Sequence, residues 1–489
     1  MAEDVVEPKV LVRSGLIKSM RWYDGFVVCL SASGFMLSTL GYAIGALGAW
    51  GALALWTVSA VLGAVQTYIF VEPAMMYGDS SGGLAAYSRE AWRRRANILS
   101  PLGGFAYWIA YTSTLSSFAL IAAQLVQAQW FSSQTWVLHV GVNVGFSQVL
   151  AVALIVLVWT INTRGMSPTR LFGYVTGVLF VVVLLVFAFV PYASGHFNSH
   201  LLTWGIGQPG QEWGGWRIAL AYLYLMGWSS YPTEQAATFA PEYIDTLPDT
   251  RKGLLSSAAF TLGVFILVPL GLGGVMSSSD IGANPISFYV TSLEKMIGSA
   301  GSGLAVILLV VACLLTMNAS TMNASRALYA TSKRGYTLRL FGKLNKHRVP
   351  ANAMTFDMLV NSAVVLLLNS VIGIVAASNM AYFVVVILTL SGVVLLRRDQ
   401  PDHPRPVKLS PVWIALAVVM TLIDIVLLVV GSTSFQLTGY GGWNIFFVGL
   451  GAILLGIVFY FWRVIVEDKR PIMWRDQREF VAFDEDAIP

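Results

Sequence analysis

Residues 216–252 read WRIALAYLYLMGWSSYPTEQAATFAPEYIDTLPDTRK, and this stretch decides the fold. It begins as an apolar helix suited to a membrane, and that pattern stops at residues 227–232. Because Pro232 donates no N–H and its ring clashes with the carbonyl one turn earlier, we expect the helix to open there. Glu234 follows, and a carboxyl group at membrane depth costs about 2.5–3.5 kcal/mol unless it is satisfied. Irregular backbone and a buried acid are tolerated in a membrane where they line a protein-enclosed cavity, so this stretch predicts half of a transport site.

The composition places the chain in a membrane. Of its 489 residues, 56% are hydrophobic and 11% are charged, whereas soluble domains carry about 25% charged residues. Both cysteines, Cys29 and Cys313, lie within apolar stretches, which predicts no disulfide framework. The sequence has no His or Cys spacing typical of a metal site, so we expect neither a metal nor a cofactor.

Twelve apolar runs have about the 20-residue length with which a helix crosses a bilayer. They predict an all-α membrane protein with twelve transmembrane helices. The runs cover residues 24–46, 50–71, 102–130, 144–162, 169–191, 217–240, 254–275, 302–329, 351–369, 374–396, 411–431 and 443–463.

The basic residues predict the orientation of these helices. Of the 30 Lys and Arg residues, all but Arg217 and Lys295 fall on one side of the arrangement. Since Lys and Arg accumulate in cytoplasmic loops, we expect both termini in the cytoplasm and the protein in the plasma membrane. Topology thereby explains the net charge of +5, which does not indicate a nucleic-acid partner.

The first span carries a second candidate interruption, Ser-Ala-Ser-Gly at residues 31–34. Small residues in a membrane helix also serve as a packing surface, and that alternative stays open. However, interruptions at matching places in two halves point to a transport site between inverted repeats. A helix that restarts after Gly34 would offer N–H groups to a carboxylate, and the carbonyls near residues 29–31 and 227–230 would accept an ammonium. This geometry predicts an amino acid or an amine as the substrate.

Six motifs, taken in order, resemble the amino acid–polyamine–organocation (APC) superfamily of secondary transporters, amino acid permease type. They are SGF at residues 33–35, DSSGG at 79–83, NTRG at 162–165, YPTE at 231–234, SRALYA at 325–330 and LRR at 396–398. The resemblance implies a five-plus-five inverted repeat of the LeuT type, with helices 1 and 6 discontinuous. This core would occupy residues 24–397, followed by two accessory helices in residues 398–466, with cytoplasmic tails at residues 1–23 and 467–489.

The resemblance also implies roles for individual residues. Ser33 and Gly34 would contact the substrate carboxylate, while carbonyls near Leu30 and Trp228 would take the amino group. Trp228 would close over the substrate, and Glu234 would tune this gate or shuttle a proton. The substrate-binding set is Leu30, Ser31, Ser33, Gly34, Phe35, Trp228, Ser229, Tyr231 and Ser320, and the gating or coupling set is Trp228, Glu234 and Thr316.

The resemblance leaves the coupling ion open. Proton-coupled relatives that replace a sodium ion carry a lysine in the fifth helix, and residues 169–191 contain none. Sodium-coupled relatives place two hydroxyls on the eighth helix, where this chain has Thr316 beside Leu315. Proton coupling, sodium coupling and obligate exchange all remain open.

The resemblance also bears on a partner chain. Relatives that bind a heavy subunit use a cysteine in the loop after the third helix. Residues 131–143 contain none, so we expect no disulfide-linked heavy subunit.

The sequence thus predicts a secondary transporter that moves amino acids by alternating access. An amine or polyamine permease, an obligate exchanger and a non-transporting nutrient receptor are the alternatives. An enzyme is not expected, because all five histidines lie away from the middle of the spans and supply no catalytic set. Two charged residues receive structural predictions: Asp424 in a helix–helix contact, and Arg326 snorkelling to the cytoplasmic face or paired with an acid there.

Overall fold

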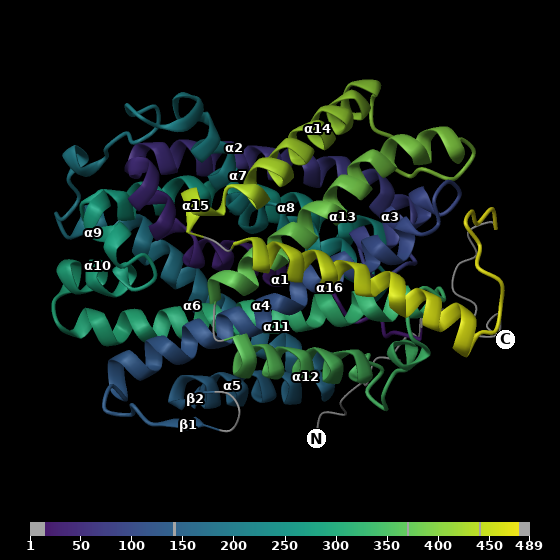
Figure 1. Cartoon of the computed structure of the whole chain (residues 1–489), viewed down its shortest axis with the longest axis horizontal. Coiled ribbons are helices and arrows are strands. Elements are labelled where there is room, and N and C mark those ends of the chain that lie inside the picture. Colours follow the sequence, from purple (N-terminus) through teal and green to yellow (C-terminus); the bar gives the residue numbers. More distant parts are fainter. Residues whose placement is uncertain (1–14, 140–142, 369–370, 440–441, 479–489) are drawn as a thin grey trace, which may run out of the picture.

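The computed structural model describes residues 15–139, 143–368, 371–439 and 442–478, and helices make up most of them. Nine helices in these residues are long and apolar enough to cross a membrane (Figure 1). The chain is therefore a multi-pass helical membrane protein. The long helices are α2 (Leu40–Met76), α4 (Leu99–Trp130), α5 (Phe146–Thr163), α6 (Met166–Ala193), α8 (Thr246–Gly273), α11 (Ala300–Lys333), α13 (Val371–Asp399), α14 (Pro411–Thr433) and α16 (Trp443–Trp462).

Three further predicted spans correspond to shorter helices, namely α1 (Trp22–Phe35), α7 (Trp216–Ser230) and α12 (Ala351–Leu368). With 14 and 15 residues, α1 and α7 are shorter than the roughly 20 residues that cross a bilayer. Each continues into a 3-10 helix, η1 (Met36–Ser38) after α1 and η4 (Pro232–Glu242) after α7. These two helices therefore change their hydrogen-bonding pattern part-way along the predicted span.

A kink at Gly48 divides α2 and falls between the predicted first and second spans. Gly48 has φ +72°, a backbone conformation that favours glycine, and a Cβ there would collide with the carbonyl oxygen of Thr203. The predicted first span therefore consists of α1, η1 and the first part of α2.

Short elements connect the long helices. The one strand pair in the described residues lies in the loop after α4, where β1 (Val137–His139) and β2 (Asn143–Gly145) pair as an antiparallel hairpin. A loop outside the apolar runs carries no helical periodicity, and pairing the two strands satisfies its backbone groups. The remaining short elements are α3 (Leu84–Trp92), η2 (Ser199–Leu201), η3 (Glu212–Gly215), α9 (Ser278–Ala283), α10 (Phe288–Ile297), η5 (Arg339–Gly342), α15 (Phe435–Thr438) and η6 (Arg463–Glu467).

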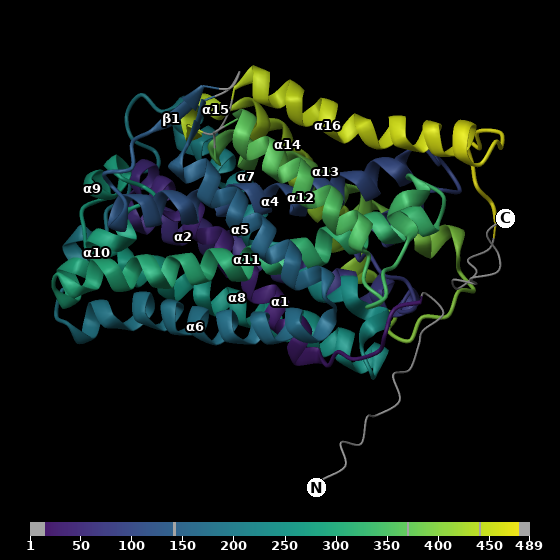
Figure 2. The same ribbon diagram turned by 90° about the horizontal axis from the view of Figure 1, so that it is seen from below.

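The helices form one bundle with α4 in its interior. α4 packs most extensively against α11 and α13, and α2 packs against α8. α14 and α16 run along the outside of the bundle (Figures 1 and 2). Outer helices expose large apolar side chains, as at Val178 (67% exposed) on α6 and Val412 (66%) on α14. Such a surface suits contact with lipid.

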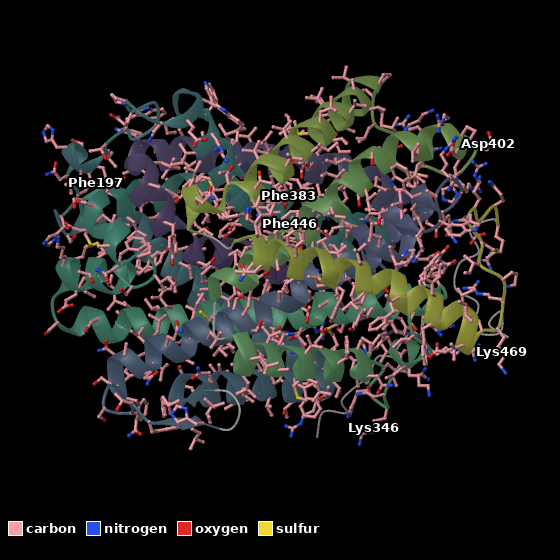
Figure 3. All side chains as sticks on the ribbon, viewed as in Figure 1. Phe197, Lys346, Phe383, Asp402, Phe446 and Lys469 are labelled. Carbon is pink, nitrogen blue, oxygen red and sulfur yellow. The ribbon has the colours of Figure 1, made fainter. Side chains whose placement is uncertain are left out.

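Charged side chains mark the ends of the bundle. Figure 3 shows Asp402 and Lys469 at one end, Lys346 at the lower edge, and Phe383 and Phe446 in the middle. The described ends of the chain lie at this basic end as well, because Met20 bridges to Tyr243 at the end of η4 and the Asp476 N–H donates to the Arg93 carbonyl (2.8 Å). The apolar middle between polar ends matches a membrane-embedded bundle.

Gly63→Ala is expected to lower the free energy of unfolding by about 1–3 kcal/mol, the cost of overpacking. A Cβ at Gly63 would lie 2.6 Å from the carbonyl oxygen of Ser230, where α2 supports the end of α7. Thermal unfolding of the purified protein in detergent measures the effect. Gly263→Ala is the matched control, since a Cβ there meets nothing within 4 Å; an equal loss of stability in both variants would contradict the close approach.

Candidate substrate site

The small residues of the first span remain helical. α1 is α-helical through residues 31–34, and its α-helical pattern ends at Phe35, before η1. The predicted opening at residues 31–34 is therefore wrong, and these residues form the packing surface that was the alternative. Gly34 gives the physical reason, because a Cβ there would collide with Oγ1 of Thr316 on α11. Small side chains let the two backbones approach.

In the sixth span, the α-helix ends where proline interrupts it. α7 is α-helical to Ser230, so residues 227–230 are not open, and the Tyr231 N–H donates to the Gly227 carbonyl (3.0 Å). The Trp228 carbonyl would next require the N–H of residue 232, which proline lacks. η4 then continues the chain as a tighter 3-10 helix. The Trp228 carbonyl is thereby left without its α-helical donor.

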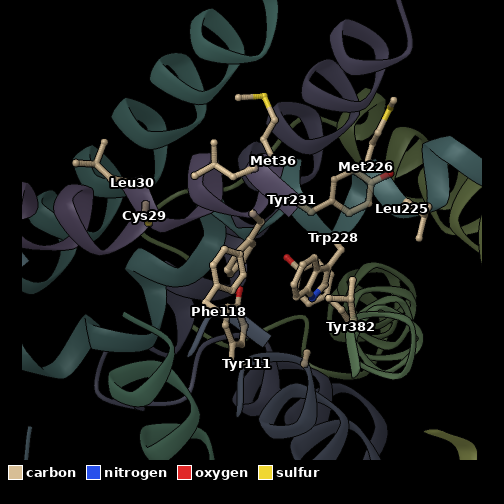
Figure 4. Close-up of a cluster of buried hydrophobic side chains, with 14 of the residues drawn as sticks. Cys29, Leu30, Met36, Tyr111, Phe118, Leu225, Met226, Trp228, Tyr231 and Tyr382 are labelled. Carbon is tan, nitrogen blue, oxygen red and sulfur yellow. The ribbon is translucent and has the colours of Figure 1, made fainter. Parts of the chain in front are cut away.

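The ends of α1 and α7 lie against each other inside the bundle. The rings of Phe35 and Trp228 stack with centroids 4.6 Å apart and planes 15° from parallel. The Cys29 thiol of α1 donates to the Thr233 carbonyl of η4 (3.3 Å). Figure 4 shows this buried cluster of side chains. The two spans with predicted interruptions therefore meet. We call the stacked pair of Phe35 and Trp228, with the residues next to each of them in the sequence, the α1–α7 junction.

Two predicted serines at the α1–α7 junction have unused hydroxyl groups. Ser33 and Ser229 are fully buried, and neither Oγ has a hydrogen-bond partner among the described residues. Leaving a buried polar group unpaired costs about 1–3 kcal/mol, so each such group requires an explanation. Ser31 is satisfied, since its Oγ accepts from Nε2 of Gln235 on η4 (3.3 Å). The unpaired hydroxyls can bind a polar ligand.

Three other predicted residues already have side-chain contacts. Leu30 points toward α6, where a Cβ added at Gly177 would lie 3.5 Å from Leu30 Cδ1. The Tyr231 hydroxyl donates to Asp424 on α14 (3.3 Å). Ser320 hydrogen-bonds to Thr114 of α4.

Glu234 lies at the centre of a buried tyrosine cluster. Its Oε2 accepts from Tyr107 (2.8 Å), and its Oε1 accepts from Tyr111 (2.6 Å) and Tyr382 (3.2 Å). Two of these tyrosines come from α4 and the third from α13, so the carboxyl group ties η4 to both helices. Sequence reasoning missed all three tyrosines. The available signal was the spacing of Tyr107 and Tyr111, which puts them on one face of the third predicted span.

The protein-family model for amino acid permeases matches residues 25–461. The chain belongs to the amino acid permease family, within the APC superfamily. This is a family of transporters rather than enzymes.

Curated relatives of the permease are similar at low identity. Mouse solute carrier family 7 member 12 is 24% identical over 39% of this chain and 40% of its own length. Rat large neutral amino acids transporter small subunit 2 is 24% identical over 73% of this chain and 66% of its own length. The match thus spans 40% and 66% of these two relatives.

Arg326 of the permease pairs with an acid at the basic end of α11, which confirms one of the two predicted arrangements. Its Nε and Nη2 contact the two carboxylate oxygens of Glu242 at 2.5 and 2.8 Å. Arg326 is 1% exposed and Glu242 is 3% exposed. The guanidinium also lies over the ring of Phe239, 4.8 Å from its centroid. This ion pair fastens the end of η4 to α11.

Asp424 of the permease joins three helices. It accepts from Nε2 of Gln66 on α2 (2.8 Å) and from the hydroxyl of Tyr231, just after α7. The predicted helix–helix contact is confirmed. Asp424 thereby links α14 to the residue that precedes Pro232. Within the described residues, no group of three or more His, Cys, Asp or Glu side chains is placed to hold a metal ion.

Gly34→Ala is expected to weaken thermal stability because the new methyl group meets the Thr316 hydroxyl, which itself donates to the Ala312 carbonyl (2.9 Å). The loss is expected to be about 1–3 kcal/mol. Gly34→Ala/Thr316→Ala removes the obstructing oxygen and should recover most of that stability. If the double variant is no more stable than Gly34→Ala alone, the glycine serves something other than this packing.

Proposed function

We propose that this permease is a secondary active transporter that moves amino acids across the plasma membrane by alternating access. Membership of the amino acid permease family supports the substrate class. The name of the rat relative, a large neutral amino acids transporter, favours neutral amino acids within that class. The proposal includes twelve spans, a five-plus-five inverted repeat and both termini in the cytoplasm.

The substrate would sit at the α1–α7 junction. The observations that carry this placement are the buried, unpaired hydroxyls of Ser33 on α1 and Ser229 on α7, together with the stacking of Phe35 on Trp228, which brings these two helix ends into contact. The hydroxyls would donate to the substrate carboxylate, and the Trp228 carbonyl would accept from its ammonium group. The prediction assigns the carboxylate to backbone N–H groups, but those of residues 31–34 lie within an α-helix. In this proposal the serine hydroxyls therefore donate to the carboxylate instead.

Opening of the site would require separating the rings of Phe35 and Trp228. Trp228 would be the moving part, since its indole N–H is held by Ser378 of α13 through one hydrogen bond of 3.1 Å. The hydrogen bonds of Glu234 to its three tyrosines would couple a movement of η4 to α4 and α13. Glu234 is our candidate for gating or proton coupling. Thr316 would hold α11 against α1 during this movement.

The proposal includes no disulfide-linked heavy subunit. The rat relative's name, small subunit, describes a protein that assembles with another chain. In this chain, the loop after α4 contains no cysteine between residues 131 and 143. A partner would therefore be held by non-covalent contacts.

Uptake into proteoliposomes tests the proposed function. Radiolabelled neutral amino acids should accumulate and be displaced by unlabelled neutral amino acids, but not by polyamines. Purified Trp228→Ala in the same vesicles is the control for background. Uptake of a polyamine alone would overturn the substrate class, and binding without uptake would overturn transport in favour of a receptor.

A further inference from the structure

A groove of about 740 Å³ lies at the basic end of the bundle, where α1 begins and α2 ends. The first turns of α8 and the segment that precedes α14 complete it. This volume falls within the roughly 300–1,000 Å³ of small-molecule sites. The groove lies outside the α1–α7 junction and plays no part in the proposed transport. Its walls are largely apolar and include Trp22, Met75, Leu247, Leu255 and Val407.

Two cations line the groove without a counter-charge. Arg251 and Lys252 are exposed in the second turn of α8, and neither forms an ion pair with a described residue. None of the described residues that line the groove is acidic. Of the acids nearby in the sequence, Asp245 pairs with Arg21 (2.5 Å), and Asp249 is buried and accepts from the Asp245 N–H (3.3 Å). The charge facing the groove is therefore positive.

An apolar wall and unpaired cations in one groove define an amphiphilic ligand with an anionic head. The apolar side chains favour hydrocarbon, and basic residues beside membrane helices attract anionic headgroups. Trp22 is 37% exposed at this level, where tryptophan is typical of the membrane–water interface. A free anion would leave the apolar wall unused, and a neutral lipid would leave the cations unpaired.

We infer that this groove binds an anionic glycerophospholipid of the cytoplasmic leaflet, with its phosphate at Arg251 and Lys252 and an acyl chain along the apolar wall. The leaflet follows from the orientation that the basic residues predict. The groove touches α1, α2 and α8 together, so a bound lipid would hold the start of α1 against α8.

Thermal stability of the purified permease in nanodiscs tests this inference. Replacing part of the phosphatidylcholine by phosphatidylglycerol is expected to raise the Tm of the natural protein. Arg251→Ala/Lys252→Ala should lose at least two thirds of that rise. Lys343→Ala/Lys346→Ala is the matched control, because both lysines are exposed and form no ion pair in the described part of the chain, and because their substitution removes the same charge. This control should keep the full rise in Tm.

Three outcomes would overturn the inference. An equal loss in both double variants would indicate general attraction to the charged bilayer. An equal rise in Tm with inorganic phosphate in phosphatidylcholine discs would indicate an anion site without a lipid. The absence of any rise in the natural protein would indicate no site.

Native mass spectrometry of the natural protein gives a second measurement that does not depend on folding of the variants. It counts the phosphatidylglycerol molecules that the protein retains against the phosphatidylcholine molecules. At least one retained phosphatidylglycerol is expected, and equal retention of the two lipids would contradict the inference.

Discussion

Arg326→Ala is expected to lower the free energy of unfolding by about 3–5 kcal/mol, because it leaves the Glu242 carboxylate buried without its partner. Both oxygens of Glu242 depend on this guanidinium, and both side chains are almost completely buried. Nη1 of Arg326 also donates to the Met322 carbonyl (3.0 Å), so the truncation removes a helix contact as well. Thermal unfolding in detergent measures the loss.

Two controls separate the ion pair from general packing. Arg326→Met/Glu242→Leu replaces both charges with apolar groups and should regain most of the stability, as replaced buried ion pairs often do. Arg339→Ala breaks the pair with Asp468, where Arg339 is 48% exposed, and should cost at most about 1 kcal/mol. Similar losses for Arg326→Ala and Arg339→Ala would contradict the buried pair.

Glu234→Ala is expected to destabilise the permease by several kcal/mol, since buried hydroxyls left without an acceptor cost about 1–3 kcal/mol each. Tyr107 keeps other partners, Thr238 (3.0 Å) and Asn323, so the loss falls on Tyr111 and Tyr382. Glu234→Gln keeps one oxygen that these two tyrosines can share. It should fold with most of the stability retained.

Glu234→Gln also tests the coupling role. If Glu234 carries the proton, uptake into proteoliposomes by this variant should no longer respond to a pH gradient. Asp424→Asn is the matched control, because it alters another buried carboxyl group at the periphery of the bundle, and it should keep the response. A normal pH-gradient response in Glu234→Gln would leave Glu234 with a structural role alone.

The sequence predicts the helices of this protein because apolar run length is a local property. Pro232 also acts locally, since a missing N–H ends an α-helix whatever surrounds it. The conformation of residues 31–34, in contrast, is not decided by the local sequence. Small residues permit both an opening and a close contact, and the position of Thr316 on another helix decides between them. The hairpin after α4 was missed because it depends on pairing across a loop.

The site could be predicted in part for the same reason. The sequence indicates which two spans meet, and the contact of Phe35 with Trp228 agrees with that. It does not indicate which side chains already have partners. Tyr231 hydrogen-bonds to Asp424, 193 positions away in the sequence, and Glu234 hydrogen-bonds to tyrosines 123 to 148 positions away. Such pairings follow from the rotation of each helix about its axis, which a broad apolar face leaves undetermined.

The most direct test of the proposed site is the thermal shift that a neutral amino acid produces in purified Ser33→Ala/Ser229→Ala. A ligand that binds only the folded protein raises its stability by mass action. Ser80→Ala/Ser81→Ala is the matched control, since these hydroxyls are likewise buried and unpartnered among the described residues but lie in the segment before α3. We expect the shift to disappear in Ser33→Ala/Ser229→Ala and to persist in the control. A shift that persists in Ser33→Ala/Ser229→Ala would contradict a substrate site at the α1–α7 junction.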